Sequence, residues 1–102
     1  MDGLIGKLYK VRGNSMEPTL KDGDIIEAVD AHTITEGDIV IYYPKEWCGA
    51  IVKRCSEICG NLAWLSSDNK SEVNAMDSRI FGWVPIDEIS GKIIDTIPKE
   101  LL

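Results

Sequence analysis

The chain has 102 residues, of which 44% are hydrophobic and 27% are charged. This length and composition are typical of one globular domain, residues 1–102, and exclude a disordered or low-complexity protein. The formal net charge of -6 argues against nucleic acid as a partner, because an acidic chain repels phosphate backbones. Lys7, Lys10 and Arg12 alternate near the start. We interpret them as the solvated face of a strand rather than a nucleic-acid-binding arm.

Cysteine and histidine usage predicts no metal site and no cofactor. The three cysteines, Cys48, Cys55 and Cys59, cannot all pair within one chain, and no histidine pair completes a zinc site. We interpret them as reduced thiols, which favours a reducing compartment such as the cytoplasm. The single histidine, His32, follows Ala31 in a polar turn and is expected at the surface, so neither Cys–His nor Ser–His catalysis is predicted.

No membrane-spanning segment is predicted. The longest apolar stretch, residues 39–43, is far shorter than the roughly 20 residues that a spanning helix needs. Residues 1–13 are interrupted by charged side chains and do not resemble a secretion signal. We therefore expect a cytoplasmic protein or, alternatively, the extracytoplasmic domain of an anchored protein whose anchor has been removed.

Short apolar or alternating runs separated by turn signals predict a mostly β domain. Ser15 is expected to begin a short helical turn that runs to Leu20, and the polar residues 66–78 are expected to form a long loop. No helix longer than two turns is predicted. The expected strands are residues 8–12, 25–29, 39–43, 50–54, 62–65, 81–85 and 92–95.

Ser15 has the context of a nucleophile. It follows Gly13-Asn14, where a sharp turn projects its hydroxyl from the end of a strand. The free backbone N–H groups of a helical turn favour the negative charge that develops when a hydroxyl attacks a carbonyl. The plainer interpretation is a helix N-cap, which serine often supplies.

Lys53 is the lysine best placed to act as a base. A lysine must be neutral for this role, and only burial lowers its pKa, near 10.4 in water, by several units. Lys53 lies within an apolar strand, and alternation puts Ile51 on its face. Taken alone, a half-exposed strand lysine is the plainer interpretation.

These residues belong to a set of motifs that closely resembles the type I signal peptidases, which are serine–lysine proteases. The motifs are residues 15–20 (SMEPTL) with Gly23-Asp24, residues 37–40 (GDIV), residues 52–54 (VKR), residues 67–69 (SDN) and residues 77–85 (DSRIFGWVP). They occur in the family's order and span nearly the whole chain. The resemblance implies a compact domain of coiled antiparallel β-sheets, for which we expect two sheets.

The self-cleaving repressors of the bacterial DNA-damage response share the first motif, the lysine and the Ser-Asp-Asn run. They generally lack the stretch that resembles residues 77–85, and they carry their own scissile bond upstream of the serine. Residues 1–14 contain no Ala-Gly or Cys-Gly pair. The resemblance is therefore closer to the signal-peptidase branch.

The resemblance implies roles for individual residues. Ser15 corresponds to the acylating nucleophile, whose own N–H forms part of the oxyanion hole, and Lys53 to the general base. Asp77 and Arg79, with Arg54, correspond to a structural ion cluster behind the site. The residues that correspond to the shallow pockets for small side chains are Met16, Leu20, Ile51 and Val52.

Two positions depart from the family pattern. Gly13 stands where some members have a serine that donates to the oxyanion. Ala75 stands where the family has a serine that orients the lysine, and Ser67, Ser71 or Ser78 is an available replacement.

The favoured function is an endopeptidase that removes a leader from a partner protein after small residues. The alternatives are a repressor-like domain that cleaves itself and a non-catalytic peptide-binding module.

Overall fold

The computed structural model describes residues 6–31 and 33–102. The strands are β1 (Lys7–Lys10), β2 (Ile25–Val29), β3 (Ile39–Tyr42), β4 (Ile51–Cys59), β5 (Leu62–Ser66), β6 (Val84–Pro85) and β7 (Gly91–Ile97). They are accompanied by the helix α1 (Ser78–Phe81) and the 3-10 helices η1 (Ile86–Glu88) and η2 (Lys99–Leu101). The prediction of a mostly β domain is confirmed. His32 lies outside the described residues, so its expected surface position stays a prediction.

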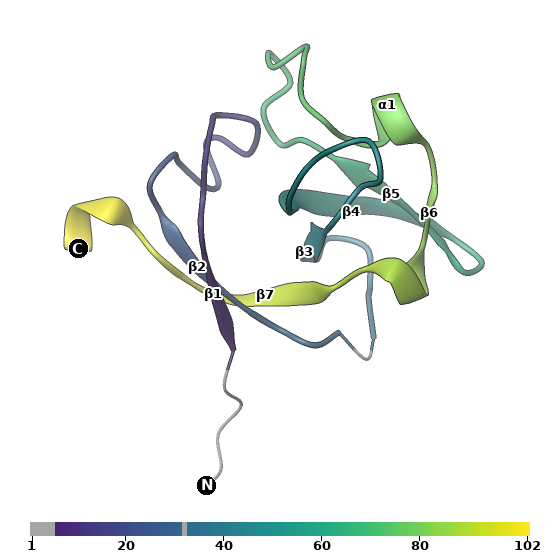
Figure 1. The fold of residues 1–102 in the computed structure, drawn as a ribbon, viewed down its shortest axis with the longest axis horizontal. Helices are drawn as coiled ribbons and strands as arrows, with labels where there is room; N and C mark the ends of the chain where they lie inside the picture. The colour runs from purple at the N-terminus through teal and green to yellow at the C-terminus, as the bar shows by residue number, and fades with distance from the viewer. Residues whose placement is uncertain (1–5, 32) are drawn as a thin grey trace, which may run out of the picture.

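All seven strands belong to one antiparallel sheet with the order β1-β2-β7-β3-β4-β5-β6. The sheet curls, with β1, β2 and β7 on one side of the molecule and β4, β5 and β6 on the other (Figure 1). The expectation of two sheets is corrected in this respect, because β7 pairs with both β2 and β3 and so joins the two halves.

The hairpin of β3 and β4 lies between two hydrophobic clusters. Side chains alternate along β3, so that Val40 and Tyr42 pack into one cluster and Ile41 into the other. On β4, Ile51 and Cys55 join the first cluster, while Val52 packs against the second. This alternation buries the face of β4 that carries Lys53 and leaves the opposite face, with Val52 and Arg54, half-buried. The second cluster consists of Val11, Met16, Leu20, Ile26, Ala28 and Ile41.

Two predicted elements differ from the structure. Residues 81–85 are not one strand: α1 ends at Phe81, and only the two residues of β6 pair with β5. The Asp77 carboxylate accepts the backbone N–H of Arg79 and so caps α1. Residues 15–20 form no regular helix: hydrogen bonds from Glu17 N to Asn14 O (3.2 Å) and from Leu20 N to Met16 O (2.9 Å) each close only a single turn. Ser15 is therefore not a helix N-cap.

The turn predicted at Gly60 joins β4 to β5, and Gly60 has a positive φ of 62° that suits glycine. Among the described residues, no helix is long and apolar enough to cross a membrane.

Candidate active site

Ser15 lies half-buried on the turn segment between β1 and β2. Two backbone hydrogen bonds of 2.8 Å, Val11 N to Asp24 O and Gly23 N to Val11 O, close the base of this segment. The backbone N–H of Gly13 donates to Asp22 Oδ1 at 2.8 Å, and Gly13 has a positive φ of 83°. Glycine adopts this conformation without steric cost, so the chain can turn sharply just before Ser15.

Asn69, in the loop that follows β5, is hydrogen-bonded to the same turn. Its backbone N–H donates to Ser15 O at 2.9 Å, and its Nδ2 donates to Asn14 O at 2.9 Å. Its Oδ1 accepts the backbone N–H of Ser71 at 3.0 Å, which fixes the orientation of the amide. The position of Ser15 is therefore set by residues from two distant parts of the chain.

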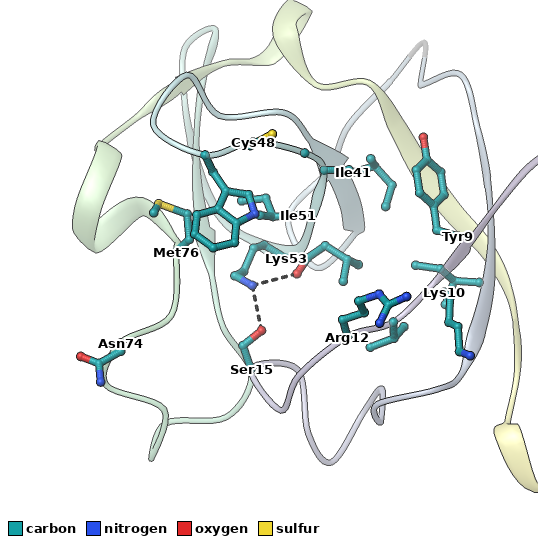
Figure 2. A pocket seen from close by; sticks show the side chains of 16 residues that line it. Tyr9, Lys10, Arg12, Ser15, Ile41, Cys48, Ile51, Lys53, Asn74 and Met76 are labelled. Atoms are coloured by element: carbon teal, nitrogen blue, oxygen red, sulfur yellow. Dashed lines mark hydrogen bonds between the residues drawn. The ribbon is translucent and has the colours of Figure 1, made fainter.

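Lys53 points from β4 toward Ser15 (Figure 2). Its Nζ lies 2.8 Å from Ser15 Oγ and donates to the backbone carbonyl of Val52 at 3.1 Å. Only 4% of Lys53 is exposed, because its side chain shares the inward face of β4 with Ile51 and Cys55. The stem thus packs in an apolar environment while the amine reaches the serine.

Burial lowers the pKa of the Lys53 amine below its ordinary value. The negative charge of Asp77 acts in the opposite direction, and the positive charge of Arg79 lowers the pKa further. A neutral amine has one lone pair and two N–H groups. The lone pair can accept the Ser15 hydroxyl proton while one N–H donates to Val52 O, so the two hydrogen bonds suit the neutral form.

A cleft of about 610 Å³ opens at this pair. Ile51 and Val52, two of the four residues expected to contact a substrate, line it. Met16 and Leu20 do not; each is 1% exposed, and both belong to the second hydrophobic cluster beneath the turn. The remaining lining residues are Tyr9, Lys10, Val11, Arg12, Ser15, Ile26, Ile41, Trp47, Cys48, Gly49, Ala50, Lys53, Asn74 and Met76.

Asp77 and Arg79 form a bidentate pair, with Nε to Oδ1 at 3.0 Å and Nη2 to Oδ2 at 2.9 Å. Ser67 Oγ donates to Asp77 Oδ2 at 2.6 Å. Burial alone would raise the pKa of Asp77, but the hydrogen bonds from Arg79 and Ser67 outweigh it and lower the pKa below its usual range. The charge of this carboxylate is therefore stabilised where only 1% of the residue is exposed.

Arg54 is not part of that cluster. It forms a separate bidentate pair with Asp68, with Nε to Oδ1 at 3.1 Å and Nη2 to Oδ2 at 2.6 Å, and also donates to Gly37 O at 2.8 Å. Thr19 Oγ1 donates to the same carboxylate at 2.6 Å. The single ion cluster predicted from the sequence is thus two separate ion pairs. The pair of Arg54 and Asp68 also links the segment after Ser15 to β4, because Asp68 accepts the hydrogen bond from Thr19.

The replacement serines predicted to orient Lys53 have other partners. Ser67 donates to Asp77, and Ser78 Oγ accepts the backbone N–H of Leu65 at 2.8 Å. Ser71 is exposed, and Ala75 is buried and has no hydroxyl. Within the described part of the chain, Val52 O supplies the second hydrogen bond to the amine.

Sequence reasoning missed the contribution of the loop between β3 and β4. Trp47 and Cys48 of this loop line the cleft, together with Met76 from the segment before α1. The available signal was a tryptophan in the short polar connection between two apolar runs; in the structure Trp47 is 55% exposed. Asp68 was noted only as part of the Ser-Asp-Asn run, since its partner Arg54 is identifiable only in the folded chain. In residues 6–31 and 33–102, no group of three acidic, histidine or cysteine residues is arranged to hold a metal.

A curled antiparallel sheet with a serine, a buried lysine and an open cleft defines a serine-peptidase-like domain. The model of the family described as Peptidase S24-like matches residues 6–85, so the chain belongs to this family. A search of the curated proteins found no match. The resemblance noted in the sequence, to signal peptidases and the related self-cleaving repressors, is confirmed at the level of this family, whose members are peptidases or self-cleaving domains.

Proposed function

We propose that the chain is a serine endopeptidase in which Ser15 is the nucleophile and Lys53 is the general base. The observation that carries this proposal is the 2.8 Å hydrogen bond between Lys53 Nζ and Ser15 Oγ at the cleft. A nucleophile and its base within hydrogen-bond distance are the geometric requirement for covalent catalysis. Burial of Lys53 favours the neutral amine that this mechanism needs.

The reaction follows from these two groups. Ser15 Oγ attacks the carbonyl carbon of the scissile peptide bond while its proton passes to Lys53 Nζ. The tetrahedral intermediate then expels the amine, which takes that proton from Lys53, and an acyl ester remains on Ser15. Water, deprotonated by Lys53, hydrolyses the ester and regenerates the serine.

The backbone N–H of Ser15 is a suitable donor to the oxyanion, because it has no hydrogen-bond partner among the described residues. A preorganised donor of this kind stabilises the charge that develops on the carbonyl oxygen. Because Gly13 stands where some family members have an oxyanion-donating serine, this role is left to backbone groups.

A substrate is expected to bind as an extended chain beside β1. This strand is at the end of the sheet, and within residues 6–31 and 33–102 it pairs only with β2, which leaves the backbone groups of its other edge without a strand partner there. Residues 9–12 line the cleft. Such an edge accepts an additional strand through backbone hydrogen bonds. Ile51 and Val52 occupy the wall near the serine with branched side chains, which supports the proposal that small residues precede the scissile bond.

The proposal is tested with quenched fluorescent peptides that carry Ala, Gly, Ser, Phe or Lys before the scissile bond. Cleavage after Ala, Gly or Ser is expected, and Ser15→Ala and Lys53→Met each abolish it. Lys99→Met removes an exposed lysine at the start of η2 and is the matched control. Cleavage that survives in Lys53→Met above the Ser15→Ala background contradicts the proposed dyad.

The same experiment separates the alternatives. A self-cleaving domain loses a segment of its own chain, which intact-mass spectrometry detects, and leaves added peptides uncut. A peptide-binding module binds the peptides, as measured by fluorescence anisotropy, without cutting either the peptides or itself.

We also propose a cytoplasmic location. Cys48 and Cys59 are exposed free thiols, a state that a reducing compartment preserves. Cell fractionation with a tagged chain distinguishes this from the alternative, an extracytoplasmic domain.

A further inference from the structure

The cleft differs in charge from the rest of the protein. The chain has 17 acidic and 11 basic residues, yet no Asp or Glu lines the cleft. Its lining includes two exposed cations, Lys10 and Arg12, in addition to the buried Lys53. A basic patch at the mouth of a cleft in an acidic protein raises the local concentration of ligands with negative charge.

Arg12 is the more informative of the two cations. The chain has three arginines, and the other two each hold an aspartate bidentately: Arg54 with Asp68 and Arg79 with Asp77. Arg12 forms no ion pair with the described residues. Its side chain lies between the Ser15–Lys53 pair and Lys10 in the view of Figure 2. A guanidinium can bind a carboxylate through two parallel hydrogen bonds in one plane, and no carboxylate of the described residues occupies Arg12 in this way.

The spacing along the chain limits where the bound carboxylate lies. Arg12 is three positions before Ser15, so their Cα atoms are at most about 10 Å apart. An extended substrate advances about 3.3 Å per residue. A group held by Arg12 therefore belongs to a substrate residue within about three positions of the scissile bond. Lys10, the last residue of β1, lines the same cleft as Arg12.

We propose that the cleft selects protein substrates that carry an aspartate or glutamate within about three residues of the scissile bond, and that Arg12 is the specificity residue that binds this carboxylate. Lys10 adds attraction for further negative charge along the same extended segment. This inference rests on the proposed endopeptidase function and specifies its substrate class.

The test compares peptides that differ only in Glu or Gln, placed in turn at each of three positions on both sides of the scissile bond. At one position, kcat/KM for the Glu peptide is expected to exceed that for the Gln peptide about two- to fivefold, as for a solvent-accessible ion pair. The preference should weaken as salt is raised from about 50 to 500 mM, because salt screens exposed charges.

A charge swap identifies the residue responsible. Arg12→Gln is expected to remove the preference for Glu, and Arg12→Glu to replace it with a preference for a Lys peptide at the same position. Lys99→Gln removes one positive charge outside the cleft and should leave the preference unchanged. Equal rates for the Glu and Gln peptides at every position overturn the inference while leaving the endopeptidase proposal intact.

A binding measurement keeps the two proposals distinguishable. The Ser15→Ala variant cannot form the acyl ester, so fluorescence anisotropy with the same peptides measures affinity alone. Tighter binding of the Glu peptide, lost in the double variant with Arg12→Gln, supports the inference even if no peptide is cut by the unmodified chain. Identical affinities in both variants overturn it.

Discussion

The backbone N–H of Asn69 donates a 2.9 Å hydrogen bond to the carbonyl of Ser15. The donor lies in the loop after β5, and the acceptor lies between β1 and β2. The Asn69 side chain donates to the preceding carbonyl, Asn14 O, as well. Two hydrogen bonds from one residue therefore fix the two peptide groups that orient the Ser15 hydroxyl toward Lys53.

Asn69→Ala removes the side-chain bond to Asn14 and is expected to lower kcat about tenfold, because small errors in the placement of a nucleophile are costly. KM should change less than twofold, since Asn69 does not line the cleft. Steady-state kinetics measure both constants. Ser71→Ala alters the same loop and is the control, and an equal loss of kcat in that variant would assign the effect to the loop as a whole.

The activity is expected to rise with pH. Burial lowers the pKa of the Lys53 amine, and only the neutral amine accepts the serine proton. The rate should therefore increase as pH passes upward through the lowered pKa and reach a plateau at a pH below the ordinary lysine value near 10.4. Lys53→Arg should be inactive at every pH, because the guanidinium stays protonated. A rate that falls through the same pH range contradicts this role.

Lys53→Met is expected to stabilise the domain by an amount on the order of 1 kcal/mol at neutral pH, because it removes the cost of burying an amine. The unfolded chain binds the lysine proton more tightly than the folded chain, so the cost is full below the lowered pKa. This cost disappears as the pH rises to the pKa of the lysine in the unfolded chain. The difference in free energy of unfolding, measured with urea, should thus shrink between neutral and alkaline pH. A stabilisation by Lys53→Met that increases with pH would contradict this explanation.

Asp77→Asn is expected to lower the free energy of unfolding by about 2 kcal/mol at pH 7, because the amide cannot accept all the hydrogen bonds from Ser67 and Arg79. The pKa of Asp77 is lowered on folding, so its stabilising contribution is present above the unfolded value near 3.9. This contribution is lost as the pH falls through the pKa of Asp77 in the folded chain. Urea titrations at pH 7 and near pH 2 should show a deficit that is smaller at the acid pH.

Modification of Cys48 is expected to block the cleft. Cys48 is exposed and lines the cleft, whereas Cys59 is exposed without lining it and Cys55 is buried. Burial also raises the pKa of the Cys55 thiol, which disfavours the reactive thiolate. A bulky maleimide should inactivate the unmodified chain and the Cys59→Ser variant, as a peptide-cleavage assay would show. Cys48→Ser should be resistant, and inactivation of that variant would place the sensitive thiol elsewhere.

The alternation of β4 could be predicted from the sequence because burial on a strand follows a period of two. Ile51 and Lys53 are both buried on one face, as the pattern indicated, and Cys55 continues that face. The turn after β1 could not be predicted in the same way. The family resemblance implies that Met16 and Leu20 line the substrate pockets, but a turn has no fixed period from which to check this, and both side chains pack into the core instead.

The ion-pair partners of the charged residues could not be predicted from the sequence either. Arg54 and Asp68 meet because β4 and β5 pair, with Arg54 opposite Ser66. The bulge between Cys55 and Glu57 shifts the register of these strands, and no local sequence motif predicts this bulge. The Ser-Asp-Asn run therefore indicated that the segment mattered without indicating which of its side chains binds the arginine.

The two members of the proposed dyad are attached to different hydrophobic clusters. Ser15 precedes Met16 of one cluster, and Lys53 lies between Ile51 and Cys55 of the other. A nascent or partly unfolded chain in which one cluster has not formed lacks the contact between Ser15 and Lys53. The proposed hydrolytic activity therefore requires that both clusters have formed, so it is expected only in molecules that have completed folding.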